Sequence, residues 1–462
     1  MKGLFPVFAG LLLWLIGGPD GLDIQAYQLF IVFLTVIASL MVRAIPMAVS
    51  VLTGLTFVVT VGILPLKSAL MGYSDTTTWL VVVAFMIAGA VIETGLGRRI
   101  ALLCISILGR SITGLGYAIC LAEFILGPVV PSNTARGGGI LAPIVDSISR
   151  TLGSSPKNKP EKAGQFLHLV GAHANLITAA MFLTGMAANP LVSKAAFDIF
   201  EIQFDWFTWA KGGIVPGLIG LTGLPLLINY ISTPTIDSIQ PIREKIQEDI
   251  QSLGPWTRQE IITACTLGLM LILWSTKPFH GWGTTTVAFL GLVIILLTRT
   301  LTWDQLVKNH KAWDVLIWLG GLLTLATGLK DLGFIDWFGN LIGNGLTGIS
   351  PIILLIALTL IYFYSMYFFS MLTAHIVALV GTIFLVASGV GLNPFLVVGI
   401  MAYFSNLCGC LTNYSTGPII IYFGNSYVQP LAWFRIGFIV SIYHLVVWLG
   451  IGSIWWKMIG WW

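Results

Sequence analysis

Apolar stretches long enough to cross a lipid bilayer recur along this chain from Leu4 to Trp456, and only one long polar interval separates them. A membrane-spanning helix needs roughly 20 apolar residues. Charged residues make up 9% of the 462 residues, whereas about 25% is typical of a soluble domain. Because lipid offers no hydrogen-bond partner to backbone N–H and C=O groups, such stretches must pair these groups internally, as helices do. The sequence therefore predicts an all-α polytopic membrane protein.

We expect about 11 transmembrane helices and two shorter re-entrant helical hairpins. The hairpins are predicted near residues 113–149 and 350–389, where short polar motifs interrupt apolar segments. The predicted spans lie near residues 4–17, 26–42, 46–63, 79–97, 166–190, 207–230, 260–275, 282–298, 313–330, 393–425 and 433–456.

The polar interval, residues 231–259, divides the chain into two halves. Isoleucines recur in it at helical spacing, which favours an amphipathic helix lying on the membrane surface, and we place this helix on the cytoplasmic face. These isoleucines are Ile236, Ile239, Ile242, Ile246 and Ile250. We predict a first repeat over residues 1–230 and a second repeat over residues 260–462.

The two halves resemble each other in sequence. Trp79–Ile100 and Val315–Trp337 both run through an apolar stretch into Thr-Gly-Leu and a charged break, and a predicted hairpin follows each. A cytoplasmic N-terminus places most of the 23 Lys and Arg residues in cytoplasmic loops, as the positive-inside rule requires. The two copies then cross the cell membrane in opposite directions. Inverted repeats with discontinuous helices are typical of secondary transporters, whose substrate site lies near the bilayer midplane.

Short polar motifs interrupt both hairpins, Pro131–Arg136 (PSNTAR) in the first and Ser370–His375 (SMLTAH) in the second. Non-helical backbone at membrane depth is tolerated only against protein or a water-filled cavity. A helix that restarts after such a break attracts anions through its free N–H groups and its dipole. Two tips that face each other would therefore suit a ligand with two carboxylates. The alternative is that the motifs are ordinary loops or helix caps.

The polar side chains at these breaks, and on the interrupted spans that follow the hairpins, are the candidate substrate ligands. The substrate-binding residues that we predict are Ser132, Asn133, Thr134, Thr373, Thr184, Asn189 and Asn413.

Two ionisable residues follow the tips closely, Arg136 in the first hairpin and His375 in the second. A charge inside the membrane costs about 2.5–3.5 kcal/mol on insertion scales, so a retained charge usually has a role or a partner. We predict that both residues supply fixed positive charge that compensates a bound dianion. The alternatives are that Arg136 pairs with Glu123 or Asp146, and that His375 is a neutral packing residue.

No motif indicates an enzyme, because neither an activated nucleophile nor a nucleotide-binding loop in its structural context is present. His168 and His173 stand five residues apart, which separates them by roughly 140° around a helix, so they do not form a zinc-binding pair. We expect no enzymatic activity, no metal, no cofactor and no nucleic-acid partner.

The motifs PSNTAR followed by GMAANP, and SMLTAH followed by LTNYSTGP, resemble those of the divalent anion:sodium symporter family. The resemblance covers nearly the whole chain and is greatest to the exchanger branch, which includes citrate/succinate and tartrate/succinate antiporters and plastid 2-oxoglutarate/malate translocators. It implies a homodimer with scaffold domains at the interface and transport domains that move as elevators. Sodium-coupled members carry Ser-Asn-Thr in both hairpins, whereas this chain has Met371, Leu372 and Thr373 in the second.

We therefore predict a sodium-independent antiporter of small dicarboxylates such as succinate, malate or 2-oxoglutarate. A fixed cation can offset substrate charge where a bound sodium ion would otherwise do so. An empty site would then keep unpaired positive charge, and its return through a low-dielectric region would require another anion. The alternative hypotheses are a sodium-coupled dicarboxylate symporter and a channel. The sequence leaves open the preferred dicarboxylate, the exchange pair and whether tricarboxylates fit.

Overall fold

The protein is helical throughout the part that the structure describes. The computed structural model describes residues 4–42, 45–236, 238–345 and 350–462; it is 79% helix, and it holds no strand within these ranges. Eight helices in these ranges are long and apolar enough to cross a membrane. The prediction of an all-α polytopic membrane protein is confirmed.

The eight long apolar helices account for most of the predicted spans and for the second hairpin. They are α2 (Ile24–Val42), α5 (Thr76–Glu93), α11 (Trp206–Ile231), α17 (His310–Asp331), α19 with η5 (Pro351–Phe368), α20 (Leu372–Gly389), α21 with η6 (Pro394–Leu411) and α23 to α24 (Pro430–Met458). Shorter apolar helices are α1 (Leu4–Ile16), α3 (Met47–Thr60), α7 (Ile112–Leu126) and α15 (Thr284–Leu297).

Two predicted spans are each interrupted by a break in the helix. The span expected at 166–190 consists of α9 (Gly164–Met181), a break and the start of α10 (Asn189–Phe200). The span expected at 393–425 consists of α21, a break and α22 (Gly417–Gly424). Both breaks hold polar residues, and both lie next to the hairpins.

The two halves of the chain contain the same succession of elements. In each half a long helix is followed by a shorter helix, a helical hairpin, a broken helix and a further long helix. The first series is α5, α6 (Leu96–Leu108), α7, η2 (Thr134–Leu141) with α8 (Ala142–Thr151), α9, α10 and α11. The second is α17, α18 (Phe334–Gly345), α19, α20, α21, α22 and α23. The inverted arrangement of the two repeats stays a prediction.

The Thr-Gly-Leu match between the halves does not mark equivalent places in the fold. Gly95 lies at the corner between α5 and α6, where its φ of +77° favours glycine. Gly328, in the second Thr-Gly-Leu, lies inside α17, where it packs against Leu29 and Leu64. The corner between α17 and α18 is instead formed by Gly333, with a φ of +78°. Short motifs of small residues thus match in sequence although their structural roles differ.

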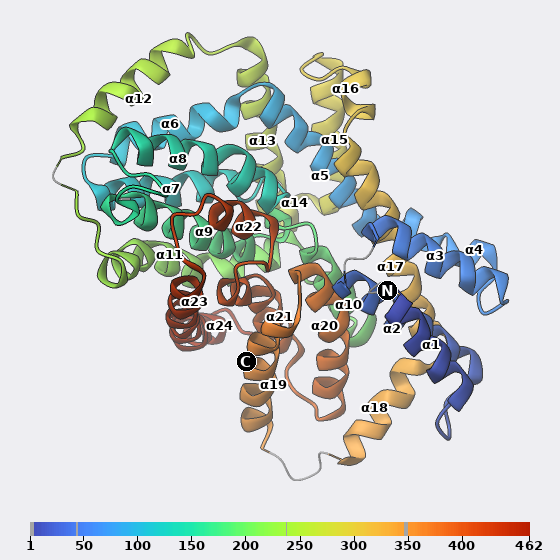
Figure 1. Ribbon diagram of the computed structural model, residues 1–462. Helices are drawn as coiled ribbons and strands as arrows, with labels where there is room; N and C mark the ends of the chain where they lie inside the picture. The colour runs from blue at the N-terminus through green and yellow to red at the C-terminus, as the bar shows by residue number, and fades with distance from the viewer. Residues whose placement is uncertain (1–3, 43–44, 237, 346–349) are drawn as a thin grey trace.

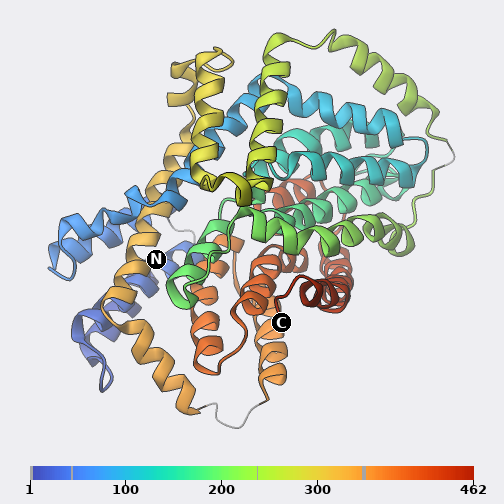
Figure 2. The same cartoon turned by 180° about the vertical axis from the view of Figure 1, so that it is seen from behind.

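Figures 1 and 2 show two groups of helices that lie on opposite sides of the molecule. Helices α3, α15, α16 (Trp303–Val307) and α17 lie on one side, and α6 to α9 with α22 to α24 lie on the other. The hairpin α19–α20 and the broken helix α21 lie between them.

The polar interval contains the predicted amphipathic helix, α12 (Gln240–Ser252), which runs along the outer edge of the molecule beside α6 (Figure 1). Ile242 and Ile246 are buried in this contact, whereas the opposite face of α12 carries charged side chains. The helix prediction is confirmed, and its cytoplasmic location stays a prediction.

Arg99 ties α6 to the turn that leads from α12 into α13 (Arg258–Ser275). Its Nε lies 2.7 Å from Glu260 Oε1 at the start of α13, and its Nη atoms donate to the carbonyls of residues 253–255. The guanidinium also lies 5.0 Å from the centroid of the Trp256 ring. Arg99 is 5% and Glu260 3% exposed. Arg99 thereby joins α6 to the end of the linker between the two halves.

We predict that Arg99→Met destabilises the protein by about 3–5 kcal/mol, because it leaves the buried Glu260 carboxylate without its cation. Thermal unfolding in detergent should show a lower melting temperature, and Glu260→Met in the same chain should restore part of it. Arg110→Met, at an exposed position at the end of α6, is the matched control. An Arg99→Met protein that melts with the control would show that this contact adds no stability.

Candidate functional site

The first hairpin tip, residues 127–133, is a short non-helical segment between α7 and η2. Pro128 and Pro131 lie in this segment, and proline cannot donate the backbone hydrogen bond that would continue the helix. Ser132 Oγ accepts a hydrogen bond from the backbone N–H of Ala135, at 3.1 Å. Ser132 thus caps the helix that restarts after the tip. The alternative that this motif is a helix cap therefore applies to Ser132.

The second tip, residues 366–371, separates α19 from α20 and is less polar. Met371 and Leu372 bring no side-chain oxygen to it. The backbone N–H of Leu372, at the start of α20, donates to the carbonyl of Ser415, at 2.9 Å. The second tip is therefore fixed to the break between α21 and α22.

The two tips meet at this break. Asn133 Nδ2 of the first tip donates to Thr416 Oγ1 at 3.0 Å, and Leu372 of the second tip binds the adjacent Ser415. Ser415 and Thr416 are neighbours in the chain, and consecutive Cα atoms are about 3.8 Å apart. The two tips, which are far apart in the sequence, therefore bind adjacent residues of the same break.

The first tip also packs closely on the start of α22. A Cβ atom added at Gly417 would overlap the side chain of Thr134, beginning with Thr134 Oγ1. Glycine at this position therefore allows the first hairpin to approach the break.

Three of the predicted ligands carry free polar groups. Thr134, Thr373 and Asn413 are partly exposed, and no side-chain hydrogen bond is found for them among the described residues. Ser132 and Asn133 are buried and use part of their hydrogen-bonding capacity within the protein. These five residues lie at the tips or on the break that the tips share.

Thr184 and Asn189 lie at the break between α9 and α10, and their side chains bind protein groups. Thr184 Oγ1 donates to the carbonyl of Pro128 at 2.5 Å and accepts from Trp206 Nε1 at 2.9 Å. Asn189 Nδ2 donates to the carbonyl of Phe182 at 3.0 Å, and its Oδ1 accepts from Asn406 Nδ2 at 2.8 Å. Both side chains are almost fully buried. They hold the break, and their predicted contact with substrate stays untested.

Arg136 is fully buried and pairs with Glu123 of α7, with 2.6 Å between Nε and Oε2. Its Nη1 donates to the carbonyls of Val130, at 2.9 Å, and Gly185, at 3.1 Å. Of the alternatives left open for Arg136, the structure shows the pair with Glu123, whereas Asp146 binds Arg150 Nε at 2.8 Å.

Glu123 has further partners on α9. Asn175 Nδ2 donates to Glu123 Oε1 at 3.0 Å, and Thr178 Oγ1 donates to Glu123 Oε2 at 3.1 Å. The Glu123 carboxylate balances the charge of Arg136 within the protein. The charge-compensating role predicted for Arg136 stays a prediction.

His375 lies in the first turn of α20 and is fully buried. Its ring centroid is 4.3 Å from that of Tyr362 and 4.9 Å from that of Phe369, and its Nε2 is 2.8 Å from Ser365 Oγ. These contacts fix the ring against the second tip. Its charge-compensating role also stays a prediction.

A cavity of about 430 Å³ reaches the first tip, where Ser132 and Ala135 form part of its wall. Its other walls come from α5 and from the segment between α15 and α17. Lys308 lies on the latter segment, and His310 and Lys311 lie at the start of α17; all three are exposed. The buried Ser132 thus lines a cavity whose exposed lining residues include these basic groups and the carboxylate of Glu93.

Several of these contacts were not predicted from the sequence. Asn175 and Thr178 lie on the apolar helix α9, and only their polarity within such a helix marks them. Ser415 and Thr416 were expected on the same interrupted span as the predicted ligand Asn413, but their contacts with the two tips were not. The glycine–proline pair at 417–418 is the signal that a helix restarts there. Within the described residues, no group of three or more His, Cys, Asp or Glu residues is placed to hold a metal ion.

An all-helical polytopic membrane protein in which two hairpin tips meet at a helix break has the architecture of a secondary transporter. The entire chain, residues 1–462, matches the family model described as the sodium:sulfate symporter transmembrane region. The protein therefore belongs to this family of transporters, which is the divalent anion:sodium symporter family expected from its hairpin motifs. It is a transporter and not an enzyme.

Relatives match over almost the whole chain. YflS of Bacillus subtilis (strain 168), for which malate transport has been suggested, is 40% identical over 99% of this chain and 96% of its own. The chloroplast dicarboxylate transporter 1 of Arabidopsis thaliana is 36% identical over 99% of this chain and 83% of its own. An L-tartrate/succinate antiporter of Escherichia coli is 32% identical over 98% of this chain and 97% of its own.

The solved structure of the YdaH transporter of Alcanivorax borkumensis has a similar fold. The TM-score is 0.59, and the match covers 100% of this chain and 97% of that chain at 12% sequence identity. This likeness supports the arrangement of the helices.

We predict that Gly417→Ala weakens transport at least about tenfold. The new Cβ would displace Thr134 and the first tip from the break, and overpacking typically costs about 1–3 kcal/mol. Gly424→Ala, at the other end of α22, is the matched control because its Cβ would meet nothing within 4 Å. Initial rates in proteoliposomes, at equal amounts of folded protein, provide the measurement. If both variants transport like the parent protein, the contact between Thr134 and Gly417 is not needed for function.

Proposed function

We propose that this protein exchanges small dicarboxylates across the cell membrane by sodium-independent antiport. The observation that carries the proposal is the meeting of the two hairpin tips at one helix break, through Asn133 with Thr416 and Leu372 with Ser415. This arrangement places two groups of donors around one site, which suits a ligand with an anionic group at each end.

The relatives support the substrate class. Those reported above are named for malate, for dicarboxylates and for L-tartrate and succinate, all of which carry two carboxylates. In our proposal the substrate is held by Ser132, Asn133, Thr134, Thr373 and Asn413. Thr184 and Asn189, whose polar groups bind the protein, act by fixing the break next to the first tip.

Positive potential at the site arises from the helices that begin there. The segment of η2 and α8 begins at Thr134, α20 begins at Leu372 and α22 begins at Gly417. Each N-terminus carries about half a positive charge, and N–H groups of its first turn that are not bonded within the protein can bind anionic oxygen. The N–H of Leu372 is not among them, because it donates to the carbonyl of Ser415. Because Glu123 balances Arg136, we assign the compensation of substrate charge mainly to these termini, and we assign to Arg136 the fixing of the first tip.

Sodium independence is supported by the composition of the second tip. A sodium ion needs several oxygen ligands, and Met371 and Leu372 supply none from their side chains. The N–H of Leu372 donates to the carbonyl of Ser415. The ring of His375 packs against the rings of Tyr362 and Phe369.

Exchange follows from the same charge distribution. A bound dianion offsets the positive ends of the helices, whereas an empty site leaves them unpaired. Moving an uncompensated site through a low-dielectric region is unfavourable, so the return step is expected to need a second anion.

The proposed transport cycle is an elevator movement in a homodimer whose N-termini are cytoplasmic. In this proposal the hairpins and broken helices form the transport domain and move against a scaffold that contains α2, α3, α5, α15 and α17. Figures 1 and 2 show the first hairpin and α22 on the opposite side of the molecule from α3 and α17, whereas the second hairpin contacts α2 through α20. Lys194 of the broken helix α10 lies 3.9 Å from Asp75 at the start of α5, and this ion pair links the two parts.

The test is exchange by purified protein in liposomes. We expect uptake of labelled succinate, malate or 2-oxoglutarate to require internal dicarboxylate and to be unchanged when sodium is replaced by potassium or choline. Acceleration by internal substrate would also exclude a simple channel. Sodium-driven uptake into vesicles without internal dicarboxylate would establish symport instead, and uniport by the unmodified protein would refute obligatory exchange.

We further predict that Lys311→Gln raises the KM up to about fivefold from one side of the membrane only, because an exposed cation near a cavity attracts anions. The effect should shrink at high ionic strength, since salt screens exposed charges. Lys330→Gln, at the other end of α17, is the matched control. KM values measured separately from each side of oriented vesicles provide the readout, and equal increases from both sides would contradict access through this cavity.

A further inference from the structure

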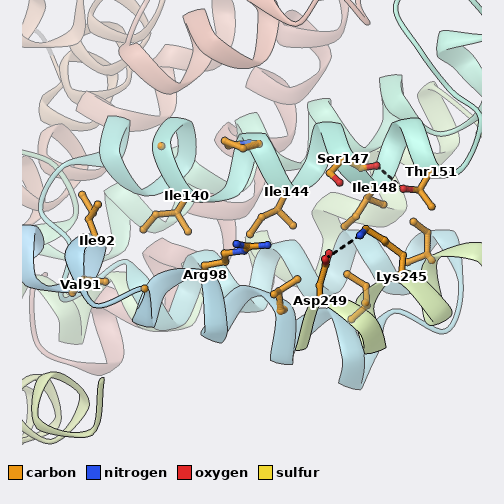
Figure 3. Close-up of a pocket in the computed structure, with 16 residues that line it drawn as sticks. Val91, Ile92, Arg98, Ile140, Ile144, Ser147, Ile148, Thr151, Lys245 and Asp249 are labelled. Atoms are coloured by element: carbon orange, nitrogen blue, oxygen red, sulfur yellow. Dashed lines mark hydrogen bonds and ion pairs between the residues drawn. The ribbon is translucent and has the colours of Figure 1, made fainter. Parts of the chain in front are cut away.

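A second cavity, of about 410 Å³, lies beside the first hairpin and is lined by residues other than the proposed ligands. Its walls are formed by the end of α5, by α6, by η2 with α8 and by α12 (Figure 3). Elements from the first half and from the linker therefore enclose one space.

Most of the wall is apolar. Ile140 and Ile144 come from the hairpin, and Ile242 and Ile246 come from α12. Ile92, at the end of α5, is 49% exposed, so the apolar part of the cavity opens to the surroundings of the protein. In Figure 3, Val91 and Ile92 lie together at one end of the cavity.

The polar groups gather towards the other end. Figure 3 shows Lys245, Asp249, Ser147 and Thr151 there, with Arg98 in the middle of the cavity. Lys245 Nζ lies 3.2 Å from Asp249 Oδ1, whereas no carboxylate pairs with Arg98 among the described residues. Two cations and one carboxylate leave the cavity with a positive charge.

The cavity lies at the end of a candidate membrane span. α5 is one of the helices long and apolar enough to cross the membrane, and it ends at Glu93. Val91 and Ile92 in the wall belong to its last turn. A cavity at the end of a span, covered by the amphipathic helix α12, meets the boundary between acyl chains and headgroups.

We propose that this cavity binds one anionic phospholipid. The phosphate lies between Arg98 and Lys245, the headgroup is near the Ser147 and Thr151 hydroxyls, and an acyl chain leaves over Ile140 and Ile92. A soluble anion would leave the isoleucine walls in contact with water, whereas an acyl chain covers them. The positive charge favours an anionic headgroup over a zwitterionic one. This proposal does not depend on the transported substrate.

The site joins segments that Arg99 already holds together. Arg98 and Arg99 are neighbours on α6; Arg99 binds the turn that follows α12, and Arg98 faces the cavity between α6 and the hairpin. A bound lipid would thus contact α6, α12 and the first hairpin at the same time.

The test is lipid binding to the purified full-length protein by native mass spectrometry. Phosphatidylglycerol and phosphatidylcholine with the same acyl chains are titrated separately, and we expect a clear preference for phosphatidylglycerol. Arg98→Gln should weaken its binding about fivefold, as expected for one cation near a membrane surface, and Arg98→Lys should restore most of it. Arg110→Gln, an exposed cation outside the cavity, should bind like the parent protein.

A second variant tests the apolar part without a change of charge. Ile144→Trp fills the cavity and should also reduce phosphatidylglycerol binding, with melting temperatures used to confirm that each variant is folded. Equal binding of both lipids, or no loss in Arg98→Gln and Ile144→Trp, would overturn the proposal. Displacement of the lipid by glycerol 3-phosphate at equal concentration would overturn the role of the acyl chain and assign the site to a free phosphate compound.

Discussion

The fold depends on satisfying backbone groups that are freed where helices break inside the membrane. Lipid offers these groups no partner, and an unsatisfied buried donor or acceptor costs about 1–3 kcal/mol. At the first break, Asn189 donates to the carbonyls of Ala179 and Phe182. At the second, the Trp433 indole donates to the carbonyl of Thr412 at 3.1 Å. Side chains thus fix the backbone at both breaks, and the hairpin tips that contact the breaks are held in defined positions.

The pair of Arg136 and Glu123 extends this constraint to the first tip. Arg136 follows the tip, Glu123 lies on the preceding α7, and Asn175 reaches Glu123 from α9. Because all of these groups are buried, each depends on the others, and loss of Arg136 or Glu123 would leave an uncompensated charge at a cost of about 3–5 kcal/mol. The hairpin, the broken helix and the candidate site are therefore coupled, and a substitution at Glu123 would affect stability and transport together.

Hydropathy and polar interruptions were enough to predict most of the spans, both hairpins and the helix in the linker, because each follows from the composition of a continuous segment. About 11 spans were predicted, whereas eight helices of the described residues are long and apolar enough to cross a membrane. Helices α6 and α18 were not predicted, since they are short and begin at corners formed by Gly95 and Gly333. The directions of the side chains could not be predicted from the sequence either. Thr184 and Thr134 are both threonines near a break, yet Thr184 binds the Pro128 carbonyl and Thr134 remains free. Either arrangement satisfies the same local pattern, and only the packing of distant helices distinguishes them.

The charges around the site show where affinity for a dianion can arise. Glu123 lies 2.6 Å from Arg136 and Asp304 lies 2.6 Å from Lys308, so neither cation is fully available to a ligand. The remaining positive potential belongs to helix N-termini, which the fold aims at the tips, and to Lys311 in the lining of the cavity. Backbone dipoles cannot dissociate or move away when the substrate leaves, and they act mainly within the last turn of a helix. In the proposed mechanism such a site keeps its potential whether or not it is occupied, and it would select ligands by geometry, because a ligand that reaches both tips with its anionic groups would offset this potential best. In this proposal, the meeting of the two tips at Ser415 and Thr416 is the feature that favours short dianions.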